Sequence, residues 1–357
     1  MPAPVRIALV GNSFAAKVQL PALRWAGGNE VVGIAGTNAP RAEATAADWN
    51  IPVATTDWRE LLALAPDLAI ITTPVDLHAP MVRAFLAETG AAILCEKPFT
   101  LNATEAADLA REGAGRLCLL DHQLRWSPWR RRLRALVQDG FLGTPWSGRI
   151  QMHFGGPARL NHAFGWWYDA ERGGGILGAI ASHLVDSLQF DMGAVLAVRA
   201  RLATYRKTRP DAEGIEREVT ADEHATLWLR MANGAEVSVD TNIMAPNSTG
   251  SLVEYVGSEG TLRLEEEDRL LGAKHDAKIA PIELDASVPT HTELGMPDQG
   301  IFARILPLYL KDVISAVGEG SATLADAATF TDGIATMRVL DAARRSATEG
   351  TWVPCQP

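Results

Sequence analysis

The chain has 357 residues, of which 47% are hydrophobic and 21% are charged. This composition is typical of a folded globular protein, and the length is sufficient for two domains of about 100–200 residues each. A formal net charge of -10 disfavours nucleic acid and anionic membrane surfaces as partners.

The three cysteines, Cys95, Cys118 and Cys355, are widely spaced along the chain. They provide neither a zinc-binding spacing nor a disulfide framework, as is usual in a reducing cytoplasm. An apolar strand begins within a few residues of the first methionine, which leaves no room for a signal peptide. No apolar run approaches the ~18 residues of a membrane span. We therefore expect a cytoplasmic protein without a metal site.

Residues 1–122 alternate apolar strands with helical segments, which predicts a parallel sheet with helices on both faces. The expected strands are Arg6–Val10, Glu30–Ala35, Leu68–Thr72, Ala92–Cys95 and Leu117–Leu120. The expected helices are Pro21–Ala26, Ala39–Trp49, Pro80–Thr89 and Ala103–Glu112. This pattern indicates an N-terminal α/β domain of the Rossmann, dinucleotide-binding type.

Residues 123–357 change to helices combined with hairpins. The expected helices are Pro128–Gln138, Ile176–Met192 and a helical region over 298–349. The expected strands are Leu196–Tyr205, Glu223–Met231, Ala235–Asn242, Leu252–Gly257 and Thr261–Glu265. Hairpin signals such as Ala232-Asn233-Gly234 predict an α+β domain with a mostly antiparallel open sheet. Whether its C-terminal helices pack back on the first domain stays open.

Two further expectations concern polar segments of this second region. Segments 206–220 and 285–299 contain proline and are polar, so we expect loops there. The basic run Arg130–Arg132, with Arg134, shares a helix with leucines, and we expect these arginines on its solvated face.

A lysine follows the fourth expected strand, in the motif Glu96-Lys97-Pro98. Open α/β sheets bind ligands at the carboxyl ends of their strands, and Pro98 biases the lysine toward an extended backbone. For an isolated tripeptide, a solvated Glu–Lys pair before a turn would be the better interpretation. The surrounding segments favour a role in binding.

The first strand leads into the loop Gly11-Asn12-Ser13-Phe14-Ala15-Ala16. The dinucleotide fingerprint places three glycines here, and only Gly11 is kept, while Ser13 and Ala16 occupy the second and third positions. We expect Gly11, Asn12, Ser13, Phe14 and Ala15 to contact a dinucleotide. On this loop alone, a cofactor-free α/β domain is an equal alternative.

The end of the second strand bears on the choice of cofactor. An acidic residue there would bind the ribose 2′-hydroxyl of NAD, but no carboxylate occurs before Glu43. Thr37, Asn38 and Arg41 are able to donate to a 2′-phosphate, which favours NADP modestly over NAD. The alternative is that Arg41 is an exposed residue of the next helix.

Six segments in this order resemble the Gfo/Idh/MocA family of pyridine-nucleotide-dependent sugar and polyol oxidoreductases, and they cover nearly the whole chain. They are Thr72-Thr73-Pro74 with His78, Glu96-Lys97-Pro98, Arg125-Trp126-Ser127-Pro128, the block Gly173 to Asp186, Tyr255 to Leu262, and Asp341 to Arg345. The resemblance implies an NAD(P)-dependent dehydrogenase that acts on a hydroxyl or carbonyl group. It also implies a homodimer or homotetramer.

The resemblance assigns roles to individual residues. Lys97 would contact both the nicotinamide ribose and the substrate hydroxyl, and His183 would be the general base. The other residues that would border the cofactor are Thr72, Thr73, Pro74, His78 and Glu96. The other residues that would line the substrate pocket are Arg125, Trp166, Trp167, Tyr168 and Ala179. A helix-capping His78 and a structural role for the aromatic residues are the alternatives.

The chain departs from the family pattern where an aspartate is expected four residues before the histidine. Ala179 occupies this position, so His183 lacks the carboxylate that would orient it. This departure keeps a second hypothesis open, a non-catalytic sensor or regulatory protein that binds a dinucleotide on the same fold.

Overall fold

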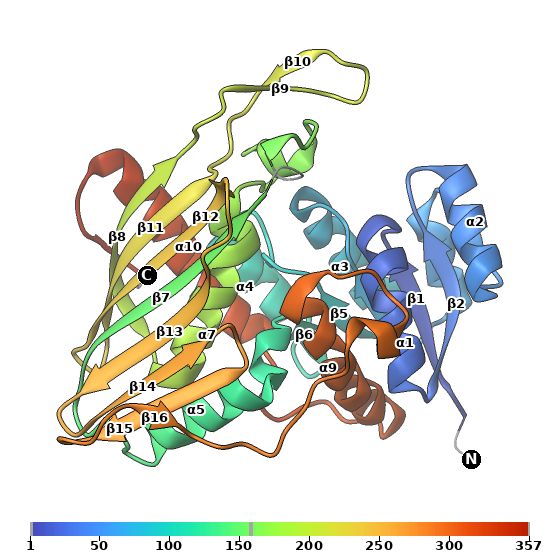
Figure 1. Cartoon of the computed structure of the whole chain (residues 1–357). Coiled ribbons are helices and arrows are strands. Elements are labelled where there is room, and N and C mark those ends of the chain that lie inside the picture. The colour runs from blue at the N-terminus through green and yellow to red at the C-terminus, as the bar shows by residue number, and fades with distance from the viewer. Residues whose placement is uncertain (1–2, 157–159, 356–357) are drawn as a thin grey trace. The chain divides into compact units, whose positions relative to one another are not determined.

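The computed structural model describes residues 3–156 and 160–355, which form two compact units. The first unit comprises the chain as far as Thr100, Thr104–Trp126 and Ser287–Gly333. The second comprises Leu101–Ala103, Ser127–Ala286 and the chain from Ile334 onward. Each unit contains a sheet of its own (Figure 1).

The first unit is built on a six-stranded parallel sheet with the order β3-β2-β1-β4-β5-β6. Its strands are β1 (Val5–Val10), β2 (Asn29–Ala35), β3 (Ala54–Thr55), β4 (Leu68–Ile71), β5 (Ala92–Cys95) and β6 (Cys118–Leu120). The central strands are buried on both faces, which explains their continuous apolar runs. The order of strands reverses between β1 and β4, and this confirms the Rossmann-type domain.

The helices of the first unit connect these strands or come from the late segment 287–333. They are α1 (Leu20–Ala26), α2 (Ala39–Trp49), α3 (His78–Glu88), α4 (Ala103–Glu112, which belongs to this unit from Thr104 onward), α8 (His291–Leu294) and α9 (Gly300–Gly318). Short helical segments of other types are η1 (Ala15–Gln19), η2 (Trp58–Leu64), η3 (Val75–Leu77) and η4 (Gln123–Trp126). Helix α9 packs against α1 and η4, so a segment distant in sequence completes this unit.

The second unit is built on a nine-stranded sheet with the order β16-β15-β14-β13-β7-β12-β11-β8-β17. Its strands are β7 (Pro145–Gly155), β8 (Val195–Ala203), β11 (His224–Met231), β12 (Glu236–Ala245), β13 (Gly250–Gly257), β14 (Gly260–Glu265), β15 (Arg269–Lys274), β16 (Ala280–Pro281) and β17 (Val353–Pro354). Only the β7–β12 pair is parallel in the described sheet, so the expected mostly antiparallel sheet is confirmed.

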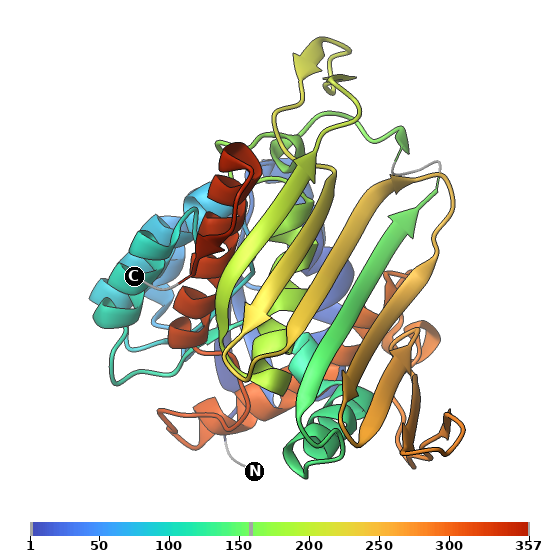
Figure 2. The same ribbon diagram turned by 90° about the vertical axis from the view of Figure 1, so that its left-hand side faces the viewer.

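Helices of the second unit pack on one face of this sheet. They are α5 (Pro128–Gln138), η6 (Leu177–Ala181), α7 (Ser182–Met192) and α10 (Phe330–Glu349, which belongs to this unit from Ile334 onward). The turn η6 contacts β11 and β12, and α5 contacts β14 and β15. Figure 2 shows the other face of the sheet from the front, with no helix of the described part of this unit across it. Along β11, Leu227 and Leu229 are buried while Trp228 and Arg230 are exposed.

The sequence prediction missed β7, which lies in the centre of the nine-stranded sheet. Its residues do alternate, with Ile150 and Met152 buried between the less buried Arg149, Gln151 and His153. This period of two is the signal that would have identified the strand. The four polar side chains and two glycines of the segment obscure this period.

Two local expectations were wrong. Segment 206–220 is not a loop but contains β9 (Thr208–Pro210) and β10 (Glu216–Glu218), joined where the Asp211 carboxylate accepts the N–H groups of Glu213 and Ile215. Segment 285–299 contains α8, whose start carries a capping box.

The arginine cluster on α5 also differs from the expectation. Arg130 is buried, and its guanidinium donates to both carboxylate oxygens of Glu267 over 2.6 and 2.7 Å. Arg131 and Arg132 are exposed, as expected. A buried arginine needs a carboxylate partner, and Glu267 lies 137 residues away in sequence, so periodicity alone could not reveal the pair.

Candidate functional site

The loop after β1 lies at the point where the order of the parallel strands reverses. Gly11 has φ +111°, and a Cβ atom on it would lie 2.8 Å from the carbonyl oxygen of Thr72, which follows β4. The Thr72 hydroxyl in turn donates to the Val10 carbonyl over 3.1 Å. This close approach of two loops requires glycine, as the dinucleotide fingerprint does at its first position.

The residues that follow Gly11 include two with polar side chains, Asn12 and Ser13, beyond the carboxyl end of β1. Asn12 is buried, yet neither its amide nitrogen nor its amide oxygen has a hydrogen-bond partner within the described residues. A buried amide without a partner is costly, so the loop fits a polar ligand such as a dinucleotide. Ser13 and Phe14 are exposed and Ala15 is buried, at the start of the π-helical turn η1. Such turns are rare and are frequent at functional sites.

Thr37, Asn38 and Arg41 lie beyond β2 and are all exposed. The Asn38 side-chain oxygen accepts the backbone N–H of Arg41 over 2.9 Å and so caps the start of α2. The side chains expected to meet a 2′-phosphate thus stand at the helix start after β2, on the same edge as Gly11.

His78 lies between two loops of this edge. It is fully buried, and its ring nitrogens lie 2.9 Å from the Thr73 carbonyl oxygen and 3.1 Å from the Phe99 carbonyl oxygen. Burial lowers the pKa of His78 below its usual value. The neutral ring has one N–H and can donate to only one of the two carbonyls, so it lies between the loop after β4 and the loop after β5 without bonding to both.

Three ionisable residues follow β5 and β6. Glu96 and Lys97 come directly after β5, and Asp121 comes directly after β6. The backbone N–H of Lys97 donates to the Glu96 carboxylate over 3.3 Å. Asp121 was missed at the sequence level, although an aspartate directly after an apolar strand is the signal that would have drawn attention to it.

Arg125 belongs to η4 in the first unit and is buried. Its guanidinium donates to the Asp332 carboxylate over 3.1 Å and to the Asp326 carbonyl over 3.4 Å. These bonds fix its position within this unit.

In the second unit, Ala179 and His183 lie on the continuous helix formed by η6 and α7, and both are buried. The helix begins after Gly175, where φ is +105°. The Asp222 carboxylate accepts the N–H of Leu177 over 2.7 Å at this start. Burial raises the pKa of Asp222 to about 6.

The three aromatic residues of η5 (Trp166–Tyr168) divide into two kinds. Tyr168 is buried, with the Arg209 guanidinium carbon 4.2 Å from its ring centre, and Arg209 is itself paired with the buried Glu223 over 2.9 Å. Trp166 and Trp167 are partly exposed, and their ring centres are 5.9 Å apart. The two tryptophans are therefore better placed than Tyr168 to meet a ligand.

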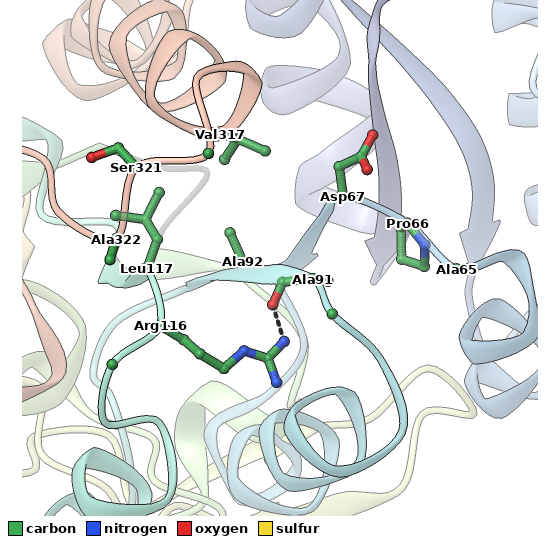
Figure 3. A pocket seen from close by; sticks show the side chains of 13 residues that line it. Ala65, Pro66, Asp67, Ala91, Ala92, Arg116, Leu117, Val317, Ser321 and Ala322 are labelled. Carbon is green, nitrogen blue, oxygen red and sulfur yellow. Dashed lines mark hydrogen bonds between the residues drawn. The ribbon is translucent and has the colours of Figure 1, made fainter.

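A cavity of about 470 Å³ lies at the amino ends of β4, β5 and β6, on the opposite edge of the first sheet (Figure 3). Its only arginine, Arg116, donates to the carbonyls of Leu86 and Ala91. This cavity is not part of the candidate site. The described residues contain no cluster of histidine, cysteine, aspartate and glutamate able to hold a metal ion, and none of their helices is long and apolar enough to cross a membrane.

Comparison with known proteins gives matches over both units. Residues 5–120 match the oxidoreductase family with an NAD-binding Rossmann fold, and residues 130–263 match the GFO/IDH/MocA C-terminal domain. An uncharacterized oxidoreductase of Synechocystis is 28% identical over 97% of this chain and 95% of its own length. D-apiose dehydrogenase of Paraburkholderia graminis is 28% identical over 79% of this chain and 74% of its own length. Levoglucosan dehydrogenase in complex with NADH has the same fold, with a TM-score of 0.86, 23% identity and 99% of each chain covered.

Proposed function

This chain belongs to the Gfo/Idh/MocA family of NAD(P)-dependent oxidoreductases, and we propose that its substrate is a sugar, a polyol or a derivative of one. In the proposed reaction, hydride passes between the nicotinamide and a hydroxyl-bearing or carbonyl carbon of this substrate. Support comes from the similarity to two dehydrogenases named for D-apiose and levoglucosan.

The position of Lys97 carries this proposal. The residue directly follows β5, and β5 pairs with β4, which borders the point of strand reversal. We assign to its ammonium group a hydrogen bond to the substrate oxygen, where it would stabilise the negative charge that develops as the hydroxyl proton leaves. The nicotinamide of a dinucleotide bound at this edge of the sheet would supply the hydride acceptor or donor.

His183 is proposed to take up the hydroxyl proton. Imidazole titrates near neutral pH, so it can act as a general base without help from a carboxylate at position 179. Trp166, Trp167 and Arg125 are proposed to line the substrate pocket, with the indole rings providing apolar surfaces on which sugar rings stack.

Substitution of Lys97 tests this function. Lys97→Ala should lower kcat at least about 100-fold with the fold retained. Lys97→Arg should recover little, because the planar guanidinium is larger and does not give up its proton. The readout is nicotinamide absorbance with a panel of sugars and polyols, and Lys311→Ala, an exposed lysine of α9, is the matched control. An alanine variant within a few-fold of the wild type would overturn the assignment of Lys97.

The second candidate function is a dinucleotide-binding sensor, which the alanine at position 179 favours. Nicotinamide absorbance with the panel of sugars and polyols distinguishes the enzyme from the sensor. Firm binding of a dinucleotide without hydride exchange on any sugar or polyol would replace the enzyme by the sensor.

We also propose that NADP is bound at least as tightly as NAD. No acidic side chain stands at positions 36–38, and Thr37, Asn38 and Arg41 are exposed at the helix start after β2. Asn38→Asp should keep the cap of α2, since aspartate is as good an N-cap as asparagine. The new carboxylate should repel a 2′-phosphate and shift the preference toward NADH at least tenfold. Titration of both cofactors measures this, and a wild type strongly selective for NADH would contradict it.

A cytoplasmic location and a homodimer or homotetramer complete the proposal. The cysteine usage supports the first, and the uncovered face of the nine-stranded sheet supports the second.

A further inference from the structure

Two carboxyl side chains, those of Glu96 and Asp121, lie next to each other near Lys97. In the parallel pairing of β5 with β6, Cys95 is the partner of Leu120, so Glu96 and Asp121 are the first residues beyond the paired strands. The backbone holds them there, because the Asp121 N–H donates to the Cys95 carbonyl and the Glu96 N–H donates to the Ile71 carbonyl, both over 2.9 Å.

These carboxyl groups are shielded from water. Asp121 is fully buried, and Glu96 is partly exposed as a residue although its Oε1 atom is buried. Neither Oε1 of Glu96 nor either carboxyl oxygen of Asp121 receives a hydrogen bond from an N–H or O–H group of the described residues. Gln19, fully buried at the end of η1, lies beside both carboxyls.

Two contacting carboxylates repel each other when both are ionised, and here Asp121 has no such donor among the described residues, while Glu96 accepts the Lys97 N–H on its Oε2. A proton held between them supplies the missing donor. Burial raises the pKa of both groups, and the charge of Glu96 raises the pKa of Asp121 further, while the neighbouring Lys97 lowers the pKa of both. The proton therefore belongs on Asp121, which donates to an ionised Glu96.

We propose that Asp121 is a positioning residue: protonated, it holds Glu96 as a single carboxylate that keeps the Lys97 ammonium group directed at the substrate oxygen. The charged and titratable groups of this cluster are Glu96, Lys97 and Asp121, with the Cys95 and Cys118 thiols nearby. Gln19 completes it as a neutral polar group whose amide also has no hydrogen-bond partner among the described residues. This inference rests on the proposed hydride transfer at Lys97.

Three variants test the role of the proton. Asp121→Leu removes the donor and should lower kcat at least tenfold. Asp121→Asn keeps a neutral N–H donor and should recover most of that loss. Asp121→Asn combined with Glu96→Gln removes the negative charge and should fall to the level of the leucine variant or below. Asp108→Asn, a surface carboxylate on α4, is the matched control, and thermal unfolding checks the fold of every variant.

A second readout needs no substrate. An amine-selective acylating reagent modifies only neutral lysine, and mass spectrometry locates the modification at Lys97. At fixed pH, the double variant should be modified at Lys97 at least tenfold faster than the wild type, because the lysine side chain is no longer held by the carboxylate. Asp121→Asn should stay much closer to the wild type.

The outcomes separate this inference from the proposed function. If no sugar is turned over but acylation of Lys97 follows the expected order, the reaction fails and the carboxyl pair stands. If Asp121→Asn is as impaired as Asp121→Leu, or the double variant is acylated at the wild-type rate, the role assigned to the shared proton is overturned.

Discussion

At the scale of single residues, several buried polar groups of the described residues are paired in ways that sequence spacing does not reveal. Asp191 is an example from the second unit: it is buried, and its carboxylate accepts the Tyr255 hydroxyl over 2.9 Å. Burial raises the pKa of Asp191 to about 7, although the nearby Arg130 opposes this effect. The folded protein therefore binds a proton there that the unfolded chain releases at lower pH.

This proton predicts a pH-dependent stability. A group whose folded pKa is raised stabilises the protein below its unfolded pKa, ~3.9 for aspartate, and this contribution is lost as the pH rises through about 7. Asp191→Asn keeps an acceptor for Tyr255 and should gain stability relative to the wild type as the pH rises from 4 to 8. The two pKa values differ by about three, which limits the gain to about 4 kcal/mol.

Urea unfolding of both proteins at several pH values measures this difference. Asp139→Asn, an exposed carboxylate at the end of α5, is the control and should show no such trend. A difference between Asp191→Asn and the wild type that does not change with pH would contradict the prediction.

At the scale of elements, the loops at the carboxyl edge of the first sheet are positioned by backbone contacts. Gly11 permits the approach of Thr72, His78 lies between the loops after β4 and β5, and the Asn38 cap starts α2. The approach of Gly11 to Thr72 fixes the shape of the loop after β1 at its start, although serine and alanine occupy two of the glycine positions.

Gly11→Ala tests this shape. The positive φ and the contact with Thr72 should make the variant less stable by about 1–3 kcal/mol, and dinucleotide affinity should fall at least tenfold. Gly90→Ala is the matched control in the same unit, since a Cβ there meets nothing within 4 Å and its φ is not positive. Its stability should change by less than about 0.5 kcal/mol. Thermal unfolding and cofactor titration measure both variants, and equal effects at the two glycines would contradict the role of Gly11.

At the scale of the whole molecule, the second unit presents one face of a wide sheet that no helix among its described residues covers (Figure 2). Trp228 on β11, which alternates with the buried Leu227 and Leu229, is 45% exposed. Large exposed aromatic side chains are typical of interfaces, where they bury much apolar area. This supports the proposed association of two or four copies.

Trp228→Glu should weaken this association and shift the protein toward the monomer at micromolar concentration, because a charge would be buried in the interface. Trp25→Glu, at an aromatic residue that is 40% exposed on α1 of the first unit, is the control and should leave the assembly intact. Light scattering after size-exclusion chromatography gives the masses. A wild type that is monomeric at every concentration would refute the proposed oligomer.

The sequence alone determined the class of each unit and most of its elements. Continuous apolar runs indicated the buried parallel strands, alternation and turn residues indicated the hairpins, and the ordered motifs around Lys97 and His183 indicated the family, because these signals are local. The tertiary structure decided what depends on distant partners: the centre of the second sheet at β7, the return of residues 287–333 to the first unit, the buried Arg130–Glu267 pair and the Asp121 carboxyl beside Glu96. Such features arise when strands far apart in sequence become neighbours, and no spacing within one segment encodes them.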